Sequence, residues 1–273
     1  APAMADFLIP DWPAPPSVRT LCSTRAGGVS QDGVGGAYAG LNLGDHVGDA
    51  AAAVAANRQI FAQALGGARP VFLQQVHGID CLSLDSTTAN GSVADACSTQ
   101  EKNLACTIMV ADCLPVLFCN AAGTQVAAAH AGWRGLAGGV LEQVLDAFLP
   151  KNSVKAAWAA PEIEVSAEPA VLAWLGPCIG QGAFEVGAEV RAAFVDKHPW
   201  SASHFAAGER GKFFCDLAAI ARGILQAAGV VVYGNDSSVA WCTYSNPALW
   251  FSHRRESQQG RQAGRLAASI YLR

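Results

Sequence analysis

ADCLPVLFCNAAGTQVAAAHAGWRG, residues 111–135, contains two apolar runs joined by a short turn, and this pattern predicts two buried strands. Asp112 and Cys113 lie at one end of the first run, and His130 closes the second run just before a glycine-rich turn into a helix. Strand ends and helix starts are where a sheet exposes reactive side chains, and a helix N-terminus favours a thiolate or an anion. The stretch therefore predicts a functional site as well as part of the core.

The segments around this stretch mix strand and helix patterns. Strands are predicted over 70–78, ending at His77, and over 104–110, 230–234 and 238–242, and helices over 50–65, 136–150, 185–195 and 214–228. The mixed order and the long connections favour an α/β fold of mixed sheets with helices packed outside, rather than a simple alternating parallel fold.

The chain length of 273 residues allows one large domain or two small ones. The least core-like stretch, KNSVKAAWAAPEIEVSAEPA (151–170), has the composition of a linker. The strand-like sequence AVLAWLGP (170–177) follows directly, and its composition does not differ from that of the sequence before the stretch. A single domain over 1–273 is therefore expected.

Composition restricts the classes of partner. The net charge of −4 gives no basic field for nucleic acid or an anionic membrane, so a small molecule is the expected partner. The nine cysteines are odd in number and lack CxxC spacing, which favours reduced thiols. No apolar run reaches the roughly 18 residues of a membrane span, and the start of the chain lacks the basic region of a signal peptide. A cytoplasmic protein is expected.

Three side chains that each end an apolar run, His77, Cys113 and His130, are candidate metal ligands. Two imidazoles and a thiolate suit zinc or copper, and three protein ligands leave the fourth tetrahedral position free for water or substrate. The same residues fit a Cys113 nucleophile with His130 as its base, or simply a buried thiol beside a hydrogen-bonded core imidazole. Asp112 either supports a ligand imidazole or caps the following turn.

Several arginines follow strands or lie beside glycine turns. From such positions Arg25, Arg134 and Arg254 could clamp a phosphate, whereas a solvated surface is the ordinary role of such side chains. GVGGAYAG (33–40) does not complete GxGxxG and no GxxxxGK[ST] occurs, so neither nucleotide-binding loop is supported.

A family resemblance rests on STRAGGVS, LNLGDHVGD, QQVHG, ADCLPVLF, HAGWRGLAGGV, LGPCIG and SHRRE, which occur in this order between Ser23 and Arg265. Together they resemble the YfiH-type laccase-domain family, formerly called multicopper polyphenol oxidases. The resemblance implies one α/β/β/α sandwich domain, similar to cysteine hydrolases of the cytotoxic necrotizing factor type. It also implies a metal, usually zinc, held by His77, Cys113 and His130, and it implies that Arg25, Asn42, Gln75 and Arg254 lie near the pocket.

The activity that the resemblance implies is phosphorolysis of adenosine, inosine and methylthioadenosine, with hydrolytic deamination of adenosine. The older oxidase name implies four coppers, which need about ten histidines, mostly in HxH pairs. Because the chain has six histidines and no HxH, four-copper chemistry is excluded, whereas a single copper is not. The HxE and PCxxC motifs of the usual zinc nucleobase deaminases are also missing.

The leading hypothesis is a zinc-dependent purine nucleoside phosphorylase with adenosine deaminase activity, acting as a monomer or weak homodimer on a nucleoside and phosphate. Zinc at His77, Cys113 and His130 would acidify a water for attack on the purine, and Arg25 with Arg134 or Arg254 would hold phosphate. The alternatives are a metal-free cysteine hydrolase or amidase using Cys113 and His130, a copper-dependent polyphenol oxidase, and a metal-responsive binding protein without catalysis.

Overall fold

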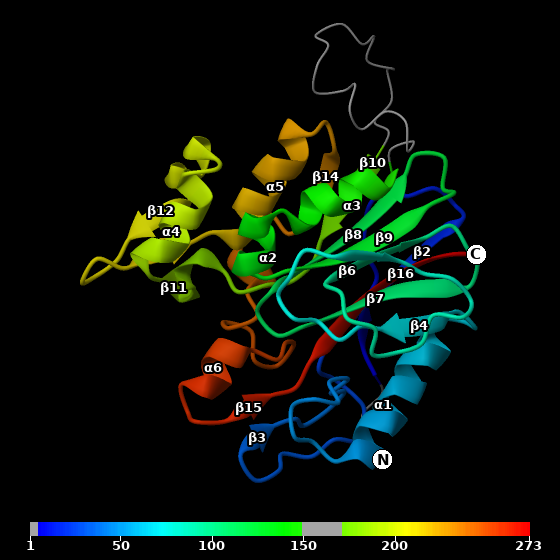
Figure 1. Cartoon of the computed structure of the whole chain (residues 1–273). Helices are drawn as coiled ribbons and strands as arrows, with labels where there is room; N and C mark the ends of the chain where they lie inside the picture. The colour runs from blue at the N-terminus through cyan, green and yellow to red at the C-terminus, as the bar shows by residue number, and fades with distance from the viewer. Residues whose placement is uncertain (1–4, 149–170) are drawn as a thin grey trace, which may run out of the picture.

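Two mixed β-sheets lie face to face in the computed structural model, which describes residues 5–148 and 171–273 (Figure 1). The segment 151–170, which has the composition of a linker, lies outside the described residues. In the order of pairing, the first sheet contains β1 (Phe7–Leu8), β2 (Val18–Ser23), β16 (Leu266–Leu272), β7 (Leu104–Val110) and β4 (Arg69–Phe72). The strand β16, near the end of the chain, thus pairs with β2, near its beginning.

The second sheet is built around the stretch 111–135. In the order of pairing it contains β14 (Val231–Gly234), β10 (Val171–Leu175), β8 (Leu114–Asn120), β9 (Val126–Ala131), β6 (Ala96–Thr99) and β5 (Cys81–Ser83). The strands β8 and β9 form an antiparallel hairpin, and β6 pairs antiparallel with the other edge of β9. The two apolar runs predicted as strands are therefore neighbours at the centre of this sheet.

Alternating side chains of each strand serve two different cores. On β8, Leu117 faces the other sheet and packs with residues such as Ile108 and Ile270, whereas Phe118 faces outward. The helices α3 (Val140–Phe148) and α5 (Leu217–Ala227) cover that outward face. The helix α1 (Ala51–Ala64) covers the outer face of the first sheet. The layers are thus α/β/β/α, which confirms the predicted fold class.

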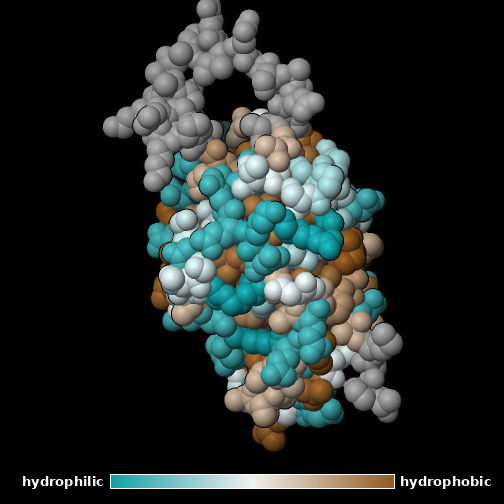
Figure 2. All heavy atoms as spheres, turned by 90° about the vertical axis from the view of Figure 1, so that its right-hand side faces the viewer, coloured by the Kyte–Doolittle hydropathy of each residue, from teal (hydrophilic) through white to brown (hydrophobic). Residues whose placement is uncertain are grey.

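Shorter elements surround this sandwich. They are the strand pair β3 (Gly36–Ala37) and β15 (Gln262–Ala263), the small sheet of β11 (Glu185–Val186), β13 (Phe213–Cys215) and β12 (Phe205–Ala207), the helices α2 (Trp133–Gly138), α4 (Ala188–Val195) and α6 (His253–Ser257), and the 3-10 turns η1 (Gln181–Ala183), η2 (Pro199–His204) and η3 (Val239–Trp241). Hydrophilic residues cover most of the middle of the face seen in Figure 2, and hydrophobic ones lie there in small separate groups. Within the described residues, no helix has the length and apolar character required to cross a bilayer.

Five predicted elements differ from the structure. The predicted helices 185–195 and 214–228 begin in the strands β11 and β13, and their helical parts start at Ala188 and Leu217. The strand predicted over 70–78 ends at Phe72 and is followed by a loop in which Gln74 forms an isolated bridge with Val93 and His77 has a left-handed φ of 61°. The helix predicted over 136–150 is divided into α2 and α3 at Gly139, whose φ is 108°. The predicted strand 238–242 is mainly the 3-10 turn η3, where the Asn246 amide donates to the carbonyls of Val239 and Cys242.

Candidate active site

The ends of three adjacent strands meet at one edge of the second sheet. Pro115 pairs with His130 across β8 and β9, which brings Cys113, just before β8, beside the end of β9. On the other side of β9 the His130 amide donates to the carbonyl of Asp95, just before β6, over 2.7 Å. Strand register therefore brings a thiol, an imidazole and a carboxylate together.

His77 reaches the same place from the loop after β4. Its backbone N–H donates to Asp95 Oδ1 over 2.9 Å, and the N–H groups of Val76 and Gly78 donate to Oδ2 over 3.0 and 2.8 Å. A non-glycine residue in the left-handed region is strained, and it persists where its surroundings hold it. The Asp95 carboxylate holds this turn and so fixes where the His77 side chain begins.

The three candidate ligands form one compact group. Their ligand atoms all lie within 4.8 Å of one another, and Cys113 Sγ lies 3.8 Å from His77 Nε2. The His130 ring meets the His77 ring edge to face, with centroids 4.8 Å apart. Because His130 Nδ1 lies 2.7 Å from Asp95 Oδ1, its Nε2 is left for a ligand, as in metal sites where a carboxylate orients the imidazole. The group could hold a metal ion.

Gly132, in the turn after β9, leaves room for this group. A Cβ at Gly132 would lie 2.9 Å from Cys113 Sγ and 3.0 Å from His77 Cδ2. Any side chain larger than hydrogen would therefore push into the space between the ligands.

Electrostatics favour a charged thiol and imidazole when no metal is bound. Burial alone would raise the pKa of the Cys113 thiol, but the charge and hydrogen bonds of His130 and His77 lower it to about 6. Burial opposes the His130 imidazolium, yet Cys113 and Asp95 raise its pKa to about 9. Although burial also opposes the Asp95 carboxylate, hydrogen bonds from His130, Gly78 and Val76 lower its pKa. A thiolate and an imidazolium therefore coexist at neutral pH.

Asp112 supports the fold beside the site rather than an imidazole. Its Oδ1 accepts from Thr243 Oγ1 and its Oδ2 accepts from the Arg254 amide at the start of α6, both over 2.6 Å. Two roles were considered for Asp112. The structure matches the cap, but Asp112 caps the first turn of α6 and not the turn that follows it in the chain. The imidazole partner is Asp95, whose only sequence signal was a carboxylate directly before a strand, in ADAC (94–97).

A cavity of about 580 Å³ opens in front of the His–Cys–His group. This volume suits a small organic substrate. Besides the three ligands, the polar lining includes Asp45, His46, Arg58, Gln74, Gln75, Asn90, His253 and Arg265. Of the residues predicted to bind substrate or phosphate, only Gln75 is among them.

Arg25, Asn42, Arg134 and Arg254 do not line this cavity. Arg25 donates to the carbonyl of Pro247 over 3.0 Å, and its guanidinium lies over a phenyl ring. Asn42 is fully buried, and its amide hydrogen-bonds within the loop 42–49 and to Arg265 N. Arg134 is exposed and lies over the ring of Trp133. These side chains serve the fold or face solvent.

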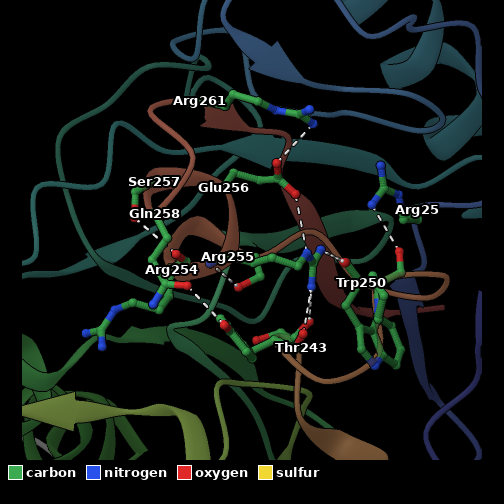
Figure 3. Close-up of polar contacts among 12 residues, drawn as sticks. Arg25, Thr243, Trp250, Arg254, Arg255, Glu256, Ser257, Gln258 and Arg261 are labelled. Atoms are coloured by element: carbon green, nitrogen blue, oxygen red, sulfur yellow. Dashed lines mark hydrogen bonds and ion pairs between the residues drawn. The ribbon is translucent and has the colours of Figure 1, made fainter.

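The arginine-rich segment near the C-terminus is largely structural. Arg255 donates to the backbone carbonyls of Thr243, Tyr244 and Trp250, and Arg261 Nη2 lies 3.0 Å from Glu256 Oε2 (Figure 3). The Arg254 side chain points away from this network, and its Nη1 donates to the Glu185 carbonyl over 3.1 Å. The segment closes the loop before α6 instead of presenting a row of free guanidinium groups.

Two cavity arginines, Arg58 and Arg265, are not among the residues predicted to bind substrate or phosphate. Arg58 lies within the predicted helix 50–65, and Arg265 lies at the end of the range over which the family resemblance extends, so no local pattern marks either of them. His46, in a glycine-rich stretch, gave the one local signal: polar side chains among glycines are typical of a binding loop.

Comparison with known proteins gives consistent matches over nearly the whole chain. Residues 19–273 match the family model described as multi-copper polyphenol oxidoreductase laccase. The purine nucleoside phosphorylase of Pseudomonas aeruginosa is 45% identical over 95% of this chain and 97% of its own length. The purine nucleoside phosphorylase YfiH of Escherichia coli is 43% identical over 95% of this chain and 98% of its own length.

Solved structures agree with these matches. A crystal structure of a Neisseria meningitidis protein, described under the family model DUF152, has a TM-score of 0.81 and 44% identity, covering 97% of this chain and 98% of that one. A Geobacillus stearothermophilus protein, YlmD, has a TM-score of 0.80 and 27% identity over the full length of both chains. The resemblance inferred from the sequence motifs is confirmed.

Proposed function

The chain belongs to the multi-copper polyphenol oxidoreductase laccase family, and from this premise we propose that it is a metal-dependent purine nucleoside phosphorylase. Adenosine, inosine and methylthioadenosine are the proposed substrates, with adenosine deamination as a second activity. The observation that carries the proposal is the group of His77, Cys113 and His130, whose ligand atoms lie within 4.8 Å of one another in the wall of a cavity. We also propose that residues 1–273 form a single domain.

Zinc is the proposed metal. Two imidazoles and one thiolate are a donor set that zinc accepts, and three protein ligands are typical of catalytic rather than structural zinc. The lowered pKa of Cys113 and the room left by Gly132 support the fit. When bound, the metal would polarise substrate oxygens and acidify a water. A single copper fits the same donors, so a copper-dependent polyphenol oxidase stays an alternative.

The chain's own residues have separate roles in this proposal. Asp95 orients His130 and holds the His77 turn, so that it positions two ligands at once. Gln75 lines the same cavity as the three ligands.

A product assay tests the proposal. Metal-free protein, zinc-loaded protein and copper-loaded protein are each incubated with adenosine and phosphate, and the products are separated by chromatography. Zinc-loaded protein is expected to form adenine, ribose 1-phosphate and inosine. Cys113→Ala should abolish these products, while Cys119→Ala, which removes a buried thiol of β8, should retain them. Absence of all three products with zinc bound ends the proposal.

A second candidate function is a metal-free cysteine hydrolase or amidase. It is favoured by one observation, the chain of contacts from Asp95 through His130 to Cys113, in which a carboxylate orients a base beside a low-pKa thiol. Chelation discriminates the two functions. A hydrolase that uses Cys113 keeps its activity on amides and esters after chelation and loses it to iodoacetamide, whereas a zinc phosphorylase loses activity on chelation.

A further inference from the structure

Two arginines line the cavity on either side of the loop 43–46. Arg58, from α1, donates to the Leu43 carbonyl, and Arg265, between β15 and β16, packs on Gly44 and accepts the Leu43 amide, so two segments distant in sequence meet at this loop. Among the residues lining the cavity in the described part of the chain, Asp45 is the one carboxylate, and its side chain is 62% exposed. An anion would therefore meet two guanidinium groups, one exposed carboxylate and, when no metal is bound, the Cys113 thiolate.

Arg58 is held in place with part of its hydrogen-bonding edge free. Its Nε donates to the Leu43 carbonyl over 2.9 Å, and its guanidinium lies 4.1 Å from the centroid of the Phe72 ring. Its Nη2 lies 3.3 Å from Asp45 Oδ1, and its Nη1 has no hydrogen-bond partner within the described residues. A guanidinium fixed by stacking loses little entropy when it binds a ligand.

Arg265 is fixed in a similar way. Its Nη1 donates to the carbonyls of Ala263 and Gly264 over 2.7 and 3.2 Å. Its stem packs on Gly44, where a Cβ would lie 2.7 Å from Arg265 Cγ. Its Nε and Nη2 have no partner among residues 5–148 and 171–273, so one edge of a positioned fork is available for an anion.

Two histidines of the lining lie close to these arginines. Burial is the largest cause that lowers the pKa of His46. Arg265 and Arg58 lower this pKa further, and Asp45 raises it in part. Burial and then Arg265 likewise lower the pKa of His253. Arg265 is therefore near enough to both imidazoles to act on their charge, and a positive group so placed attracts an anion.

We propose that Arg58 and Arg265 form the inorganic phosphate subsite of this cavity, with His46 and His253 as its hydrogen-bonding neighbours. This inference rests on the proposed phosphorolysis and replaces Arg25, Arg134 and Arg254 as the phosphate-binding residues. In the reaction a hydrogen phosphate oxygen bonds to ribose C1′ as the bond from C1′ to the purine nitrogen breaks. The bonding electron pair leaves with the purine, and the phosphate proton ends on the purine, so that atoms and charge balance.

The phosphate dependence of zinc-loaded full-length protein tests the subsite. The KM values for phosphate and for adenosine are measured for the wild type, Arg58→Gln and Arg265→Gln. Each variant is expected to raise the phosphate KM about 10- to 100-fold, as loss of a charge-assisted contact does, and to change the adenosine KM less than about threefold. Arg191→Gln is the matched control, because that guanidinium also lies over a phenyl ring, 5.1 Å from the Phe213 centroid, but outside the cavity.

Failure of the subsite and failure of the function give different results. If the wild type forms no ribose 1-phosphate, the proposed function fails, and calorimetric titration with inorganic phosphate still decides the subsite. Phosphate binding by the wild type that both glutamine variants lose supports it, and no phosphate binding overturns it. Adenosine monophosphate that binds far more tightly than phosphate, through the same arginines, would assign the subsite to a nucleotide and overturn inorganic phosphate as its occupant.

Two further results would overturn the proposal. One is an unchanged phosphate KM in Arg58→Gln and Arg265→Gln that retain their zinc and their melting temperature. The other is a rise in phosphate KM caused by Arg25→Gln, Arg134→Gln or Arg254→Gln instead. If a glutamine variant does not fold, Arg58→Lys and Arg265→Lys replace it, because lysine keeps the charge but loses the planar fork and should still raise the phosphate KM.

Discussion

Asp95 Oδ1 lies 2.7 Å from His130 Nδ1, and the same carboxylate also accepts the backbone N–H groups of Val76, His77 and Gly78. The Asp95 side chain is fully buried. One carboxylate therefore orients an imidazole of β9 and shapes the loop that carries the other imidazole. Two candidate ligands from distant segments depend on one residue that is itself not a ligand.

Asp95→Asn should weaken zinc binding without removing a ligand. Asparagine lacks the charge and one acceptor, so we expect zinc affinity to fall about 10- to 100-fold. The free energy of unfolding should fall by roughly 2 to 3 kcal/mol, because hydrogen bonds to a buried charge are lost. Competition with a chromogenic chelator and chemical denaturation measure the two effects.

A carboxylate elsewhere is the control for that variant. Asp216 accepts the Ala219 amide and caps α5. Asp216→Asn should lose at most about 1 kcal/mol of stability and keep its zinc affinity. If folded Asp95→Asn binds zinc as tightly as the wild type, the positioning role of Asp95 is wrong.

Cys113 of the metal-free protein should react with iodoacetamide at neutral pH. Its pKa of about 6, below the ordinary 9.0, means that the reactive thiolate appears as the pH rises through about 6 and is lost below it. Buried Cys22 and Cys119, with pKa values of about 12, should stay unlabelled. Mass spectrometry of labelled peptides across pH gives the midpoint, and zinc should block labelling.

His130→Gln tests the cause of that low pKa. Without the imidazolium, the midpoint of Cys113 labelling should move upward, toward or above 9.0, because burial then acts with less opposition. A midpoint that stays near 6 in this variant would show that another group stabilises the thiolate.

Local sequence patterns predicted the parts of the fold that depend on continuous apolar runs. The runs 104–110 and 114–120 are the strands β7 and β8, and the helix predicted over 50–65 is α1. The three candidate ligands were also predictable, because each stands where an apolar run ends. Their convergence needed more than the pattern, since the register of β8 and β9 and a left-handed His77 bring them together.

The remaining site residues depend on long-range pairing that no local pattern encodes. Asp95 meets His130 because Ala96 pairs with Ala129. Arg58 faces the cavity because its guanidinium packs over the ring of Phe72, at the end of β4. Conversely, Arg25 and Arg254 stand at plausible phosphate-binding positions but donate to the carbonyls of Pro247 and Glu185. An arginine beside a turn donates its hydrogen bonds to whichever acceptor the tertiary fold brings nearest.

Gly132→Ala should disturb the ligand group through sterics alone. The added Cβ would lie 2.9 Å from Cys113 Sγ, so the thiol must move or the turn must shift. We expect zinc affinity to fall at least about tenfold while the layers of the sandwich persist. Gly182→Ala is the matched control, since nothing lies within 4 Å of a Cβ there. Equal zinc affinity in the two variants would contradict the close approach of Gly132 to the ligands.

Gln75 offers the last test, because it separates support of the cavity wall from contact with substrate. Its Oε1 accepts the Met109 amide over 2.8 Å and its Nε2 donates to the Met109 carbonyl over 2.7 Å, so the side chain pairs with β7 beyond the end of β4. Gln75→Leu should therefore lower the free energy of unfolding by about 1 to 3 kcal/mol, the value of two hydrogen bonds. The KM for adenosine should change less than about threefold, because the amide is already satisfied by backbone.

Gln74→Leu is the matched control for this variant, since Gln74 lines the same cavity but is exposed. It should leave the free energy of unfolding within about 0.5 kcal/mol of the wild type. Denaturant titration and steady-state kinetics measure both variants side by side. A KM for adenosine raised roughly tenfold in Gln75→Leu, with stability unchanged, would mean that the amide turns from Met109 to the nucleoside when substrate binds. In that case Gln75 would act in substrate binding, as well as lying near the pocket as the family resemblance implies.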